Sequence, residues 1–307
     1  MALTLMIVML AILGTWTSET KPLTLQEASM VERYEQWMAQ YDRKYTDDVE
    51  KESCFKIFKE NAEFVEKVNN EGNHTYKLSL NAFADLTNEE FIASRTGYKI
   101  TNQSRSTNSG PSSFRYESLT DIPMTVDWRE QEAVTPIKDQ GQCGCCWAFQ
   151  RGCNGGLMDY AFQYIIQNKG LTTETNYPYE AMAGTCDAEK ESQSEAQISN
   201  FEDVPSKSEE ALLKAVASQP VSVAIDSDGA FEHYSSGVFN GECGNKLNHG
   251  VTVIGYGTTE DGTKYWLVQN SWDESWGESG YVQIQRDVDA PDGLCGIAIE
   301  ASYPVVA

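Results

Sequence analysis

Four cysteines fall close together at positions 143, 145, 146 and 153, and this cluster constrains the fold more than any other feature of the chain. The 307 residues hold eight cysteines but only three histidines, so chemistry that needs an imidazole has few candidates. A zinc knuckle built on Cys143 and Cys146 lacks the second spaced pair that would complete four ligands, so we expect no metal. The alternative is a thiol nucleophile at the N-terminus of a helix, where oriented backbone N–H groups favour the thiolate.

The N-terminus carries an uncharged apolar run from Leu3 to Leu13. It is too short for a membrane-spanning helix, which needs about 20 residues, and is typical of a secretory signal peptide, which we place at residues 1–18. A buried N-terminal helix is the alternative. Secretion makes the later cysteines candidates for disulfides. Asn73 and Asn102 begin Asn-X-Thr/Ser acceptors, so we expect a glycoprotein.

The charge of the chain excludes two classes of partner. Asp and Glu number 46 against 23 Lys and Arg, a formal net charge of −23. Such a chain repels phosphate backbones and anionic lipid, so we expect no nucleic-acid partner, and no membrane partner once the leader is removed. Seven tryptophans and 40% hydrophobic residues favour a folded core over disorder.

Composition divides the chain into a helical segment, a linker and a mixed domain. Between about 27 and 70 the apolar residues recur at helical spacing, as at Phe58, Ala62 and Val65. Residues 101–113 are polar and predict a linker. Beyond Ile122 the pattern predicts an α+β domain. We expect strands at Val221–Ile225, Gly250–Tyr256, Lys264–Gln269 and Gly280–Gln285, and a helix at Glu209–Ser218.

Two histidines lie in the mixed domain, and their contexts differ. His233 has aromatic neighbours and is interpreted as packing. His249 enters a strand, and Asn270-Ser271-Trp272 follows the next strand. An asparagine can accept from one imidazole nitrogen while the other faces a thiol, and an indole can exclude water from the pair.

These segments resemble the papain family of cysteine proteases, of the cathepsin L-like type and especially its plant senescence-associated members. The resemblance covers about residues 30–307 and includes Cys143–Trp147, where Cys145 replaces the usual Ser or Ala. The other motifs of the mixed domain are Gly152-Cys153-Asn154-Gly155-Gly156, the His249 loop and Asn270-Ser271-Trp272. In the helical segment Glu50, Phe58, Asn61, Val65 and Asn69 match one pro-domain motif, and Asn81, Phe83 and Asp85 another, although Cys54 and Ser79 depart from them.

The resemblance implies a zymogen with an α+β, two-lobe papain-like fold, made of a helical lobe and an antiparallel β-barrel-like lobe. The implied domains are a helical inhibitory pro-domain at 27–100, an activation linker at 101–121 and the catalytic domain at 122–307. It also implies a thiol endopeptidase that needs no cofactor and acts on protein or peptide substrates as a monomer. The implied inhibitors are its own prosegment and cystatin-like proteins, and the implied compartment is vacuolar, lysosome-like or extracellular.

The resemblance also assigns roles. Cys146 is the implied nucleophile, His249 its acid–base partner, Asn270 the orienting residue and Gln140 an oxyanion-hole donor. The implied substrate-binding residues are Gly155, Gly156, Leu157, Met158, Ala224, Asn248, Gly250, Trp272 and Glu300. Because Glu300 falls near the bottom of the implied pocket for the residue before the scissile one, we expect that pocket to tolerate a basic side chain. The implied disulfides are Cys143–Cys153 and Cys243–Cys295, which leave Cys145 and Cys186 unpaired.

The spacing departs from the family. His249 and Asn270 follow Cys146 by 103 and 124 residues, whereas the family places them about 130–150 residues downstream. One internal deletion explains both, and the junction lies between Phe149 and Cys153. The helical lobe is then incomplete, and Cys186 has lost its partner. The alternative function is therefore an inactive or misfolded splice or gene-model product, possibly inhibitor-like through its prosegment. A disulfide-rich binding protein without enzyme ancestry fits the ordered Cys, His and Asn motifs poorly.

Overall fold

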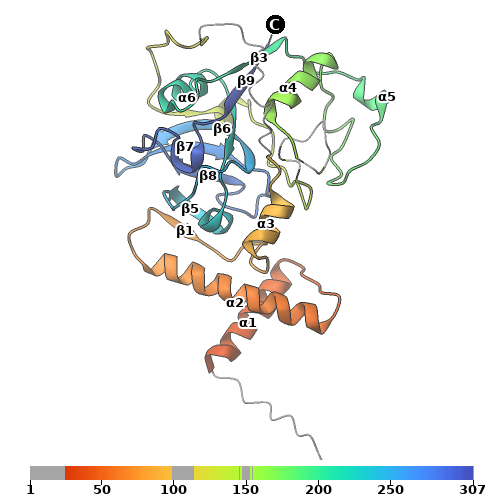
Figure 1. Ribbon diagram of the computed structural model, residues 1–307, viewed down its shortest axis with the longest axis vertical. Coiled ribbons are helices and arrows are strands. Elements are labelled where there is room, and N and C mark those ends of the chain that lie inside the picture. The colour runs from red at the N-terminus through yellow and green to blue at the C-terminus, as the bar shows by residue number, and fades with distance from the viewer. Residues whose placement is uncertain (1–24, 99–113, 145, 147–152, 154, 307) are drawn as a thin grey trace, which may run out of the picture. The chain divides into compact units, whose positions relative to one another are not determined.

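The computed structural model describes residues 25–98, 114–144, 146, 153 and 155–306 (Figure 1). The expected leader, the stretch 101–113, Cys145 and the junction at 149–152 lie outside the described residues. The chain divides into two compact units, Met1–Lys44 and Tyr45–Ala307. Within the described ranges, no helix is both long and apolar enough to cross a membrane.

The first unit contains helix α1, Leu25–Gln40. Aromatic residues line one stretch of it. The rings of Tyr34 and Trp37 stack with centroids 5.8 Å apart, and Tyr41 lies 5.7 Å from Trp37. The guanidinium of Arg43 lies 5.6 Å from the centre of the Trp37 ring, a cation–π distance.

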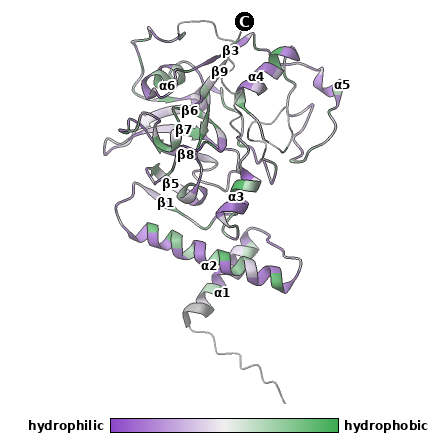
Figure 2. Cartoon of the chain, viewed as in Figure 1, coloured by the Kyte–Doolittle hydropathy of each residue, from purple (hydrophilic) through white to green (hydrophobic). Residues whose placement is uncertain are grey.

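The second unit begins with helix α2, Asp48–Asn70, whose start is set by local chemistry. The side chain of Asp47 accepts hydrogen bonds from the backbone N–H groups of Val49 and Glu50, which satisfies two otherwise unpaired donors of the first turn. The residues predicted as an apolar stripe form the buried face: Phe58, Ala62, Val65 and Val68. Figure 2 shows the alternation of hydrophobic and hydrophilic residues along α2.

A short strand and a short helix follow α2. Strand β1 spans Tyr76–Leu78, and helix α3 spans Asn88–Arg95. Thr87 and Glu90 form a capping box at the start of α3, in which each side chain bonds the other's backbone N–H. α3 therefore has a defined start, and its last residue, Arg95, leads directly into the candidate site.

One nine-stranded sheet dominates the second unit, in the order β1-β5-β8-β7-β6-β4-β9-β3, with β2 paired to β6. The pairings are antiparallel except for β5 with β8, which is parallel. The strands are β2 Val126–Asp127, β3 Asn200–Asp203, β4 Val221–Ile225, β5 Tyr234–Phe239, β6 His249–Thr258, β7 Lys264–Gln269, β8 Tyr281–Gln285 and β9 Ala301–Val305. The helices are α4 Met158–Gln167, α5 Ala188–Glu191 and α6 Glu209–Val216, with 3₁₀ turns η1 Trp128–Gln131, η3 Gly229–His233 and η4 Leu294–Gly296. The predicted α+β fold class is confirmed.

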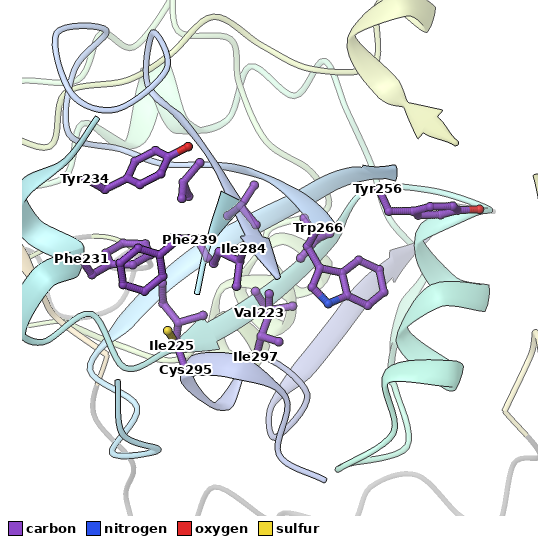
Figure 3. Packing of buried hydrophobic residues seen from close by; sticks show 14 of the residues in the cluster. Val223, Ile225, Phe231, Tyr234, Phe239, Tyr256, Trp266, Ile284, Cys295 and Ile297 are labelled. Carbon is purple, nitrogen blue, oxygen red and sulfur yellow. The ribbon is translucent and has the colours of Figure 1, made fainter. Parts of the chain in front are cut away.

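The main core lies on this sheet, and its aromatic residues come from several strands (Figure 3). Phe231, Trp266 and Ile284 are fully buried in it. Burying a large apolar side chain typically contributes about 1.5–3 kcal/mol, so a core of this size stabilises the sheet as one body. His233, interpreted as packing, is 1% exposed and lies 6.3 Å from the Phe64 ring of α2.

Candidate active site

His249 opens β6, where it pairs with Ile225 at the end of β4, and its side chain is fully buried. β7 runs antiparallel to β6, so Asn270, just after β7, returns to the same end of the sheet. Asn270 Oδ1 lies 2.8 Å from His249 Nε2. The ring of Trp272 stacks on the imidazole with centroids 4.5 Å apart and planes inclined by 22°. The structure therefore brings together the histidine, asparagine and tryptophan that the sequence singled out.

The amide of Asn270 is oriented by its neighbour. Its Oδ1 also accepts a hydrogen bond from the backbone N–H of Ser271 at 2.8 Å, so oxygen rather than nitrogen faces the ring. His249 Nε2 must then carry the proton that it donates. Nδ1 is buried, with no hydrogen-bond partner in the described part of the chain. This is the tautomer in which Nδ1 is available to a thiol.

Burial controls the charge of the ring. The loss of solvent lowers the pKa of His249 to about 4, and the hydrogen bond with Asn270 opposes that shift. The imidazole is therefore neutral at neutral pH in this covered state.

Gln140 lies beside the Asn270–Trp272 loop and is 3% exposed. Its backbone N–H donates to the Ser271 carbonyl at 2.9 Å, and its Oε1 accepts from Ser271 Oγ at 2.6 Å. Because Oε1 accepts a bond, the Gln140 Nε2 donors point the other way, to the carbonyls of Arg95 at 2.9 Å and Cys143 at 3.0 Å. Cys146 follows nearby in the chain as a half-buried thiol.

The segment after α3 occupies the site. The Arg95 carbonyl accepts from Gln140 Nε2 and, at 3.0 Å, from Trp272 Nε1. Gly97 O accepts from Gly156 N at 2.9 Å, and Gly156 forms a parallel bridge with Tyr98. These contacts hold the backbone of residues 95–98 against Gln140, Trp272 and Gly156.

Glycines make this close approach possible. A Cβ on Gly97 would lie 1.8 Å from the Gly144 carbonyl oxygen, and one on Gly155 would lie 1.9 Å from the Gly97 oxygen. Gly155 also has a φ of +82°, which glycine adopts without strain. Neither Gly97 nor the bound segment around it was singled out by the sequence reasoning. The sequence signal that could have found it is a glycine two residues after the end of a helix.

The side chain of Tyr98 is 6% exposed and belongs to a buried apolar cluster. The other buried members of this cluster are Leu157, Met158 and Ala224, which the resemblance implies for substrate binding, together with Leu247 and Phe162. Gly250 pairs with Ala224 across β4 and β6 at the edge of this group. Three residues that the resemblance implies for substrate binding therefore pack in one cluster with Tyr98, a residue that the sequence reasoning did not single out.

Carboxylates lie near Tyr98. Burial, then the charges of Glu300, Asp159 and Asp203, raise the pKa of its phenol. Burial, Asp203 and Glu300 raise the pKa of Asp159 to about 6, opposed by the hydrogen bond that Ser302 Oγ donates at 2.9 Å. The cluster around Tyr98 is thus apolar, with carboxylates nearby.

Aromatic residues anchor the rest of the segment. The ring of Trp272 meets Phe91 of α3 edge-on at 4.9 Å and Phe83 at 6.0 Å. Asn81 Nδ2 and Trp276 Nε1 both donate to the Glu232 carbonyl, at 2.6 and 3.0 Å. Trp272, predicted as a substrate-binding residue, therefore contacts this segment on one side and His249 on the other.

Two disulfides join Cys143 to Cys153 and Cys243 to Cys295. They are the pairs that the resemblance implies. Cys186 is an exposed thiol whose Sγ lies 3.0 Å from Glu191 Oε2. Asp273, directly after Trp272, has a φ of +71°. Across the described residues, no three His, Cys, Asp or Glu side chains form a group that could hold a metal.

Comparison with known proteins decides the family. A profile described as papain family cysteine protease matches residues 122–151 and 149–305. This chain belongs to the papain family of cysteine proteases. A second profile, the cathepsin propeptide inhibitor domain (I29), matches residues 34–91, so the protease carries an inhibitory propeptide.

Papain-family relatives cover nearly the whole chain. The senescence-specific cysteine protease SAG39 of Oryza sativa subsp. indica is 48% identical over 91% of this chain and 91% of its own length. Vignain of Ricinus communis is 46% identical over 99% of this chain and 93% of its own. Among solved structures, the recombinant stem bromelain precursor superposes with a TM-score of 0.81 at 39% identity, covering 91% and 99% of the two chains. The proform of the ragweed pollen allergen Amb a 11 has a TM-score of 0.84 at 37% identity, covering 92% and 96%.

Proposed function

We propose that this papain-family protease is the zymogen of a thiol endopeptidase in which Cys146 is the nucleophile and His249 its acid–base partner. The observation that carries the proposal is that one imidazole nitrogen of His249 is engaged and the other is buried without a hydrogen-bond partner among the described residues. Nε2 is engaged by Asn270 at 2.8 Å, and Nδ1 has no partner among the described residues. A ring held in this way can exchange a proton with a thiol at Nδ1 without turning.

The proposed reaction divides peptide hydrolysis into two steps. The Cys146 thiolate, formed when its proton passes to His249 Nδ1, attacks the carbonyl carbon of the substrate. The oxygen takes the negative charge and accepts from Gln140 Nε2 and the Cys146 backbone N–H; one such donor is typically worth about 3 kcal/mol. His249 gives its proton to the leaving amine, and a thioester remains. Water, deprotonated by His249, then hydrolyses the thioester and restores the thiol.

The covered state supports an autoinhibited zymogen. Gln140 Nε2, the proposed oxyanion donor, is bonded to the Arg95 carbonyl of the prosegment. The buried imidazole is neutral at neutral pH, because burial lowers its pKa to about 4. We therefore infer that release of the prosegment both opens the cleft and lets solvent stabilise the imidazolium. The proposed boundaries are leader 1–18, pro-domain 27–100, activation linker 101–121 and catalytic domain 122–307.

The experiment is to express the full chain, acidify it and follow both processing and hydrolysis of a dipeptidyl substrate. A thiol-reactive epoxide should label Cys146 after processing, and Cys146→Ala should abolish labelling and turnover. A processed chain that folds, binds the epoxide reversibly and never forms the covalent adduct would contradict the proposed nucleophile.

A basic side chain is the proposed pocket preference, since Glu300 and Asp159 both act on the phenol of Tyr98 in that pocket. The test compares Leu and Arg substrates with wild type and Glu300→Ala. An unchanged ratio between them would contradict the role of Glu300.

A second candidate is an inactive short form that acts as an inhibitor through its prosegment. Two observations favour it. The papain-family profile matches in two pieces that meet at residues 149–151. The alignment to the Ricinus communis vignain spans 341 positions, whereas this chain has 307 residues, so part of the relative has no counterpart here. We propose that the missing stretch lies between Phe149 and Cys153 and that Cys186 lost its partner there.

The two candidates are separated by a direct comparison. The short chain and a full-length homologue are expressed and assayed side by side. Separately, transcripts are sequenced across the codons of Phe149 and Gln150. Turnover comparable to that of the homologue favours the active protease. Absence of epoxide labelling, with inhibition of the homologue by the short chain, favours the inhibitor. We further propose a glycosylated monomer of the secretory pathway, resident in a vacuole-like or extracellular compartment and sensitive to cystatin-like inhibitors.

A further inference from the structure

Asn248, the residue before His249, is held at both ends of its side-chain amide. Its Oδ1 accepts two hydrogen bonds from Ser227, from the backbone N–H at 3.0 Å and from Oγ at 2.9 Å. Its Nδ2 donates to Asp228 Oδ1 at 2.6 Å. Because a backbone N–H can only donate, the orientation of this amide is settled by Ser227. The bond to Asp228 involves a carboxylate, which makes it the strongest of the three.

The backbone of Asn248 contributes to the cleft. Its N–H donates to the Ile225 carbonyl at 2.9 Å, which ties this peptide to the end of β4. Its carbonyl accepts from two prosegment N–H groups, those of Gly97 at 3.1 Å and Tyr98 at 2.9 Å. The Asn248 carbonyl is therefore an acceptor for a peptide backbone that lies in the cleft. The ring of His249, by contrast, is held separately by Asn270 and Trp272.

Asp228 lies at a helix N-cap position, but its side chain does not cap the helix. It is the N-cap residue of η3, Gly229–His233, where an aspartate usually accepts a bond from the first turn. Its side chain makes no such bond. The carboxylate turns instead to Asn248. Its own N–H donates to Asp226 Oδ1 at 3.3 Å, which fixes the backbone from which it reaches.

Without the hydrogen bond from Asn248, the surroundings of Asp228 would disfavour its ionised carboxylate. Burial raises the pKa of Asp228, as do the nearby charges of Asp226 and Glu232, while the hydrogen bond from Asn248 and the charge of Lys246 lower it. Asn248 is thus the neighbouring group whose hydrogen bond offsets the burial of this carboxylate.

We propose that Asp228 is a positioning residue for peptide binding: it clamps the Asn248 side chain and thereby aims the Asn248 carbonyl at the backbone of whatever lies in the cleft. In the zymogen that backbone is Gly97 and Tyr98. In the processed protease it is the substrate, and this second half rests on the proposed function.

The first test needs no catalytic activity. Amide hydrogen exchange is measured on the full chain with Cys146→Ala, which prevents self-processing, with and without Asp228→Ala. Loss of one hydrogen bond should speed exchange at Gly97 and Tyr98 about tenfold. The amide of Leu78, bonded to Asn69 Oδ1 within the pro-domain, should not change. Asp228→Asn, which keeps an acceptor, should restore part of the protection.

Asp261→Ala is the matched control, because that aspartate bonds Thr259 and Thr263 in the loop beyond the far end of β6 and no other described residue. Unchanged exchange at Gly97 and Tyr98 in Asp228→Ala would overturn the proposal. So would a change at Leu78 as large as at Gly97, since the effect would then be general loosening.

The second test uses the processed protease. Asp228→Ala should raise KM for peptide substrates about tenfold, whereas alkylation by iodoacetamide, which has no peptide backbone to bind, should keep its rate. An equal fall in kcat/KM for peptide hydrolysis and in the rate of alkylation would show that Asp228 acts on the thiol rather than on the acceptor carbonyl. If the wild type proves inactive, the proposed function fails while the exchange result still decides the role of Asp228.

Discussion

Gly97 of the prosegment and Gly144 of the catalytic domain are in backbone contact: a Cβ on Gly97 would lie 1.8 Å from the Gly144 carbonyl oxygen. Real Cβ atoms do not come this close to backbone, and neither partner can rotate away. The contact therefore requires glycine at position 97. It allows Gly97 O and N–H to bond with Gly156 and Asn248 on the two sides of the cleft.

Gly97→Ala should therefore release the prosegment from the cleft. We expect the unprocessed chain at pH 7 to react with a peptidyl epoxide at least about tenfold faster than wild type, because one lost hydrogen bond already corresponds to about that factor. Mass spectrometry of the Cys146 adduct gives the rate. Gly184→Ala is the control, since a Cβ there meets nothing within 4 Å. Equal labelling of Gly97→Ala and wild type would refute the prediction.

Asn270→Ala should lower kcat about tenfold. The 2.8 Å contact with His249 Nε2 fixes the ring, and a hydrogen bond of this kind contributes about 1–1.5 kcal/mol. The measurement is steady-state hydrolysis by the processed protease. Asn200→Ala, at the exposed start of β3, should leave kcat unchanged. A normal kcat in Asn270→Ala would mean that Trp272 alone holds the ring.

Acid should destabilise the zymogen through His249. Its folded-state pKa of about 4 lies below the value of about 6.5 for an unfolded histidine, so the unfolded chain binds more protons between these values. The contribution of the buried neutral ring to the free energy of unfolding is complete above about pH 6.5 and is lost as the pH falls toward 4. Urea unfolding of the Cys146→Ala zymogen at several pH values should show this loss.

In His249→Gln the same pH window should give a smaller loss of unfolding free energy, since no imidazole remains to be protonated. His74→Gln is the control, because His74 is only half-buried beside Glu71. Identical pH profiles for His249→Gln and the parent would contradict the assignment.

Asp159 should have the opposite effect. Its pKa of about 6 in the folded chain lies above the usual value for an aspartate, so ionisation is unfavourable there and stability falls as pH rises from about 4 through 6. Asp159→Asn, which still accepts from Ser302 Oγ, should raise the melting temperature at pH 7 more than at pH 4.5. Asp121→Asn, at an exposed position, should change neither. A uniform shift at both pH values would indicate packing rather than charge.

The bounds of the core strands could be predicted closely, because buried strands have a recognisable pattern of apolar residues in the sequence. β4 and β7 occupy the predicted ranges Val221–Ile225 and Lys264–Gln269, and β6 extends its predicted range by one residue before and two after. α6 ends two residues earlier than predicted, at Val216. These elements lie in the main core, where apolar side chains must alternate or cluster.

The helical region at 27–70 illustrates a weaker prediction. Its apolar spacing indicated helix, but the break between α1 and α2 depends on Asp47, whose side chain starts a new helix by bonding Val49 and Glu50. An aspartate with a glutamate three positions later is a usable start signal. The sequence therefore predicted that this region is helical, but not that it forms two separate helices.

The candidate site was predictable only where chemistry demands particular side chains. His249, Asn270 and Trp272 are such residues, and they do come together. The path of the prosegment was not predictable, because the N–H and carbonyl groups of Gly97 and Tyr98 bind the cleft through backbone that every residue carries. Asp228 was not predictable for a different reason, because its proposed role depends on a side-chain bond to a residue twenty positions away.

The pairing of β1 with β5 means that the inhibitor and the catalytic domain share a single sheet. Only three residue pairs, from Tyr76 to Leu78, close this edge. Departure of the prosegment leaves β5 as an outer strand with unpaired N–H and carbonyl groups, which is a surface prone to strand addition. Removal of residues 76–78 would therefore expose the backbone groups of β5 that now pair with β1, and the catalytic domain would gain a free sheet edge.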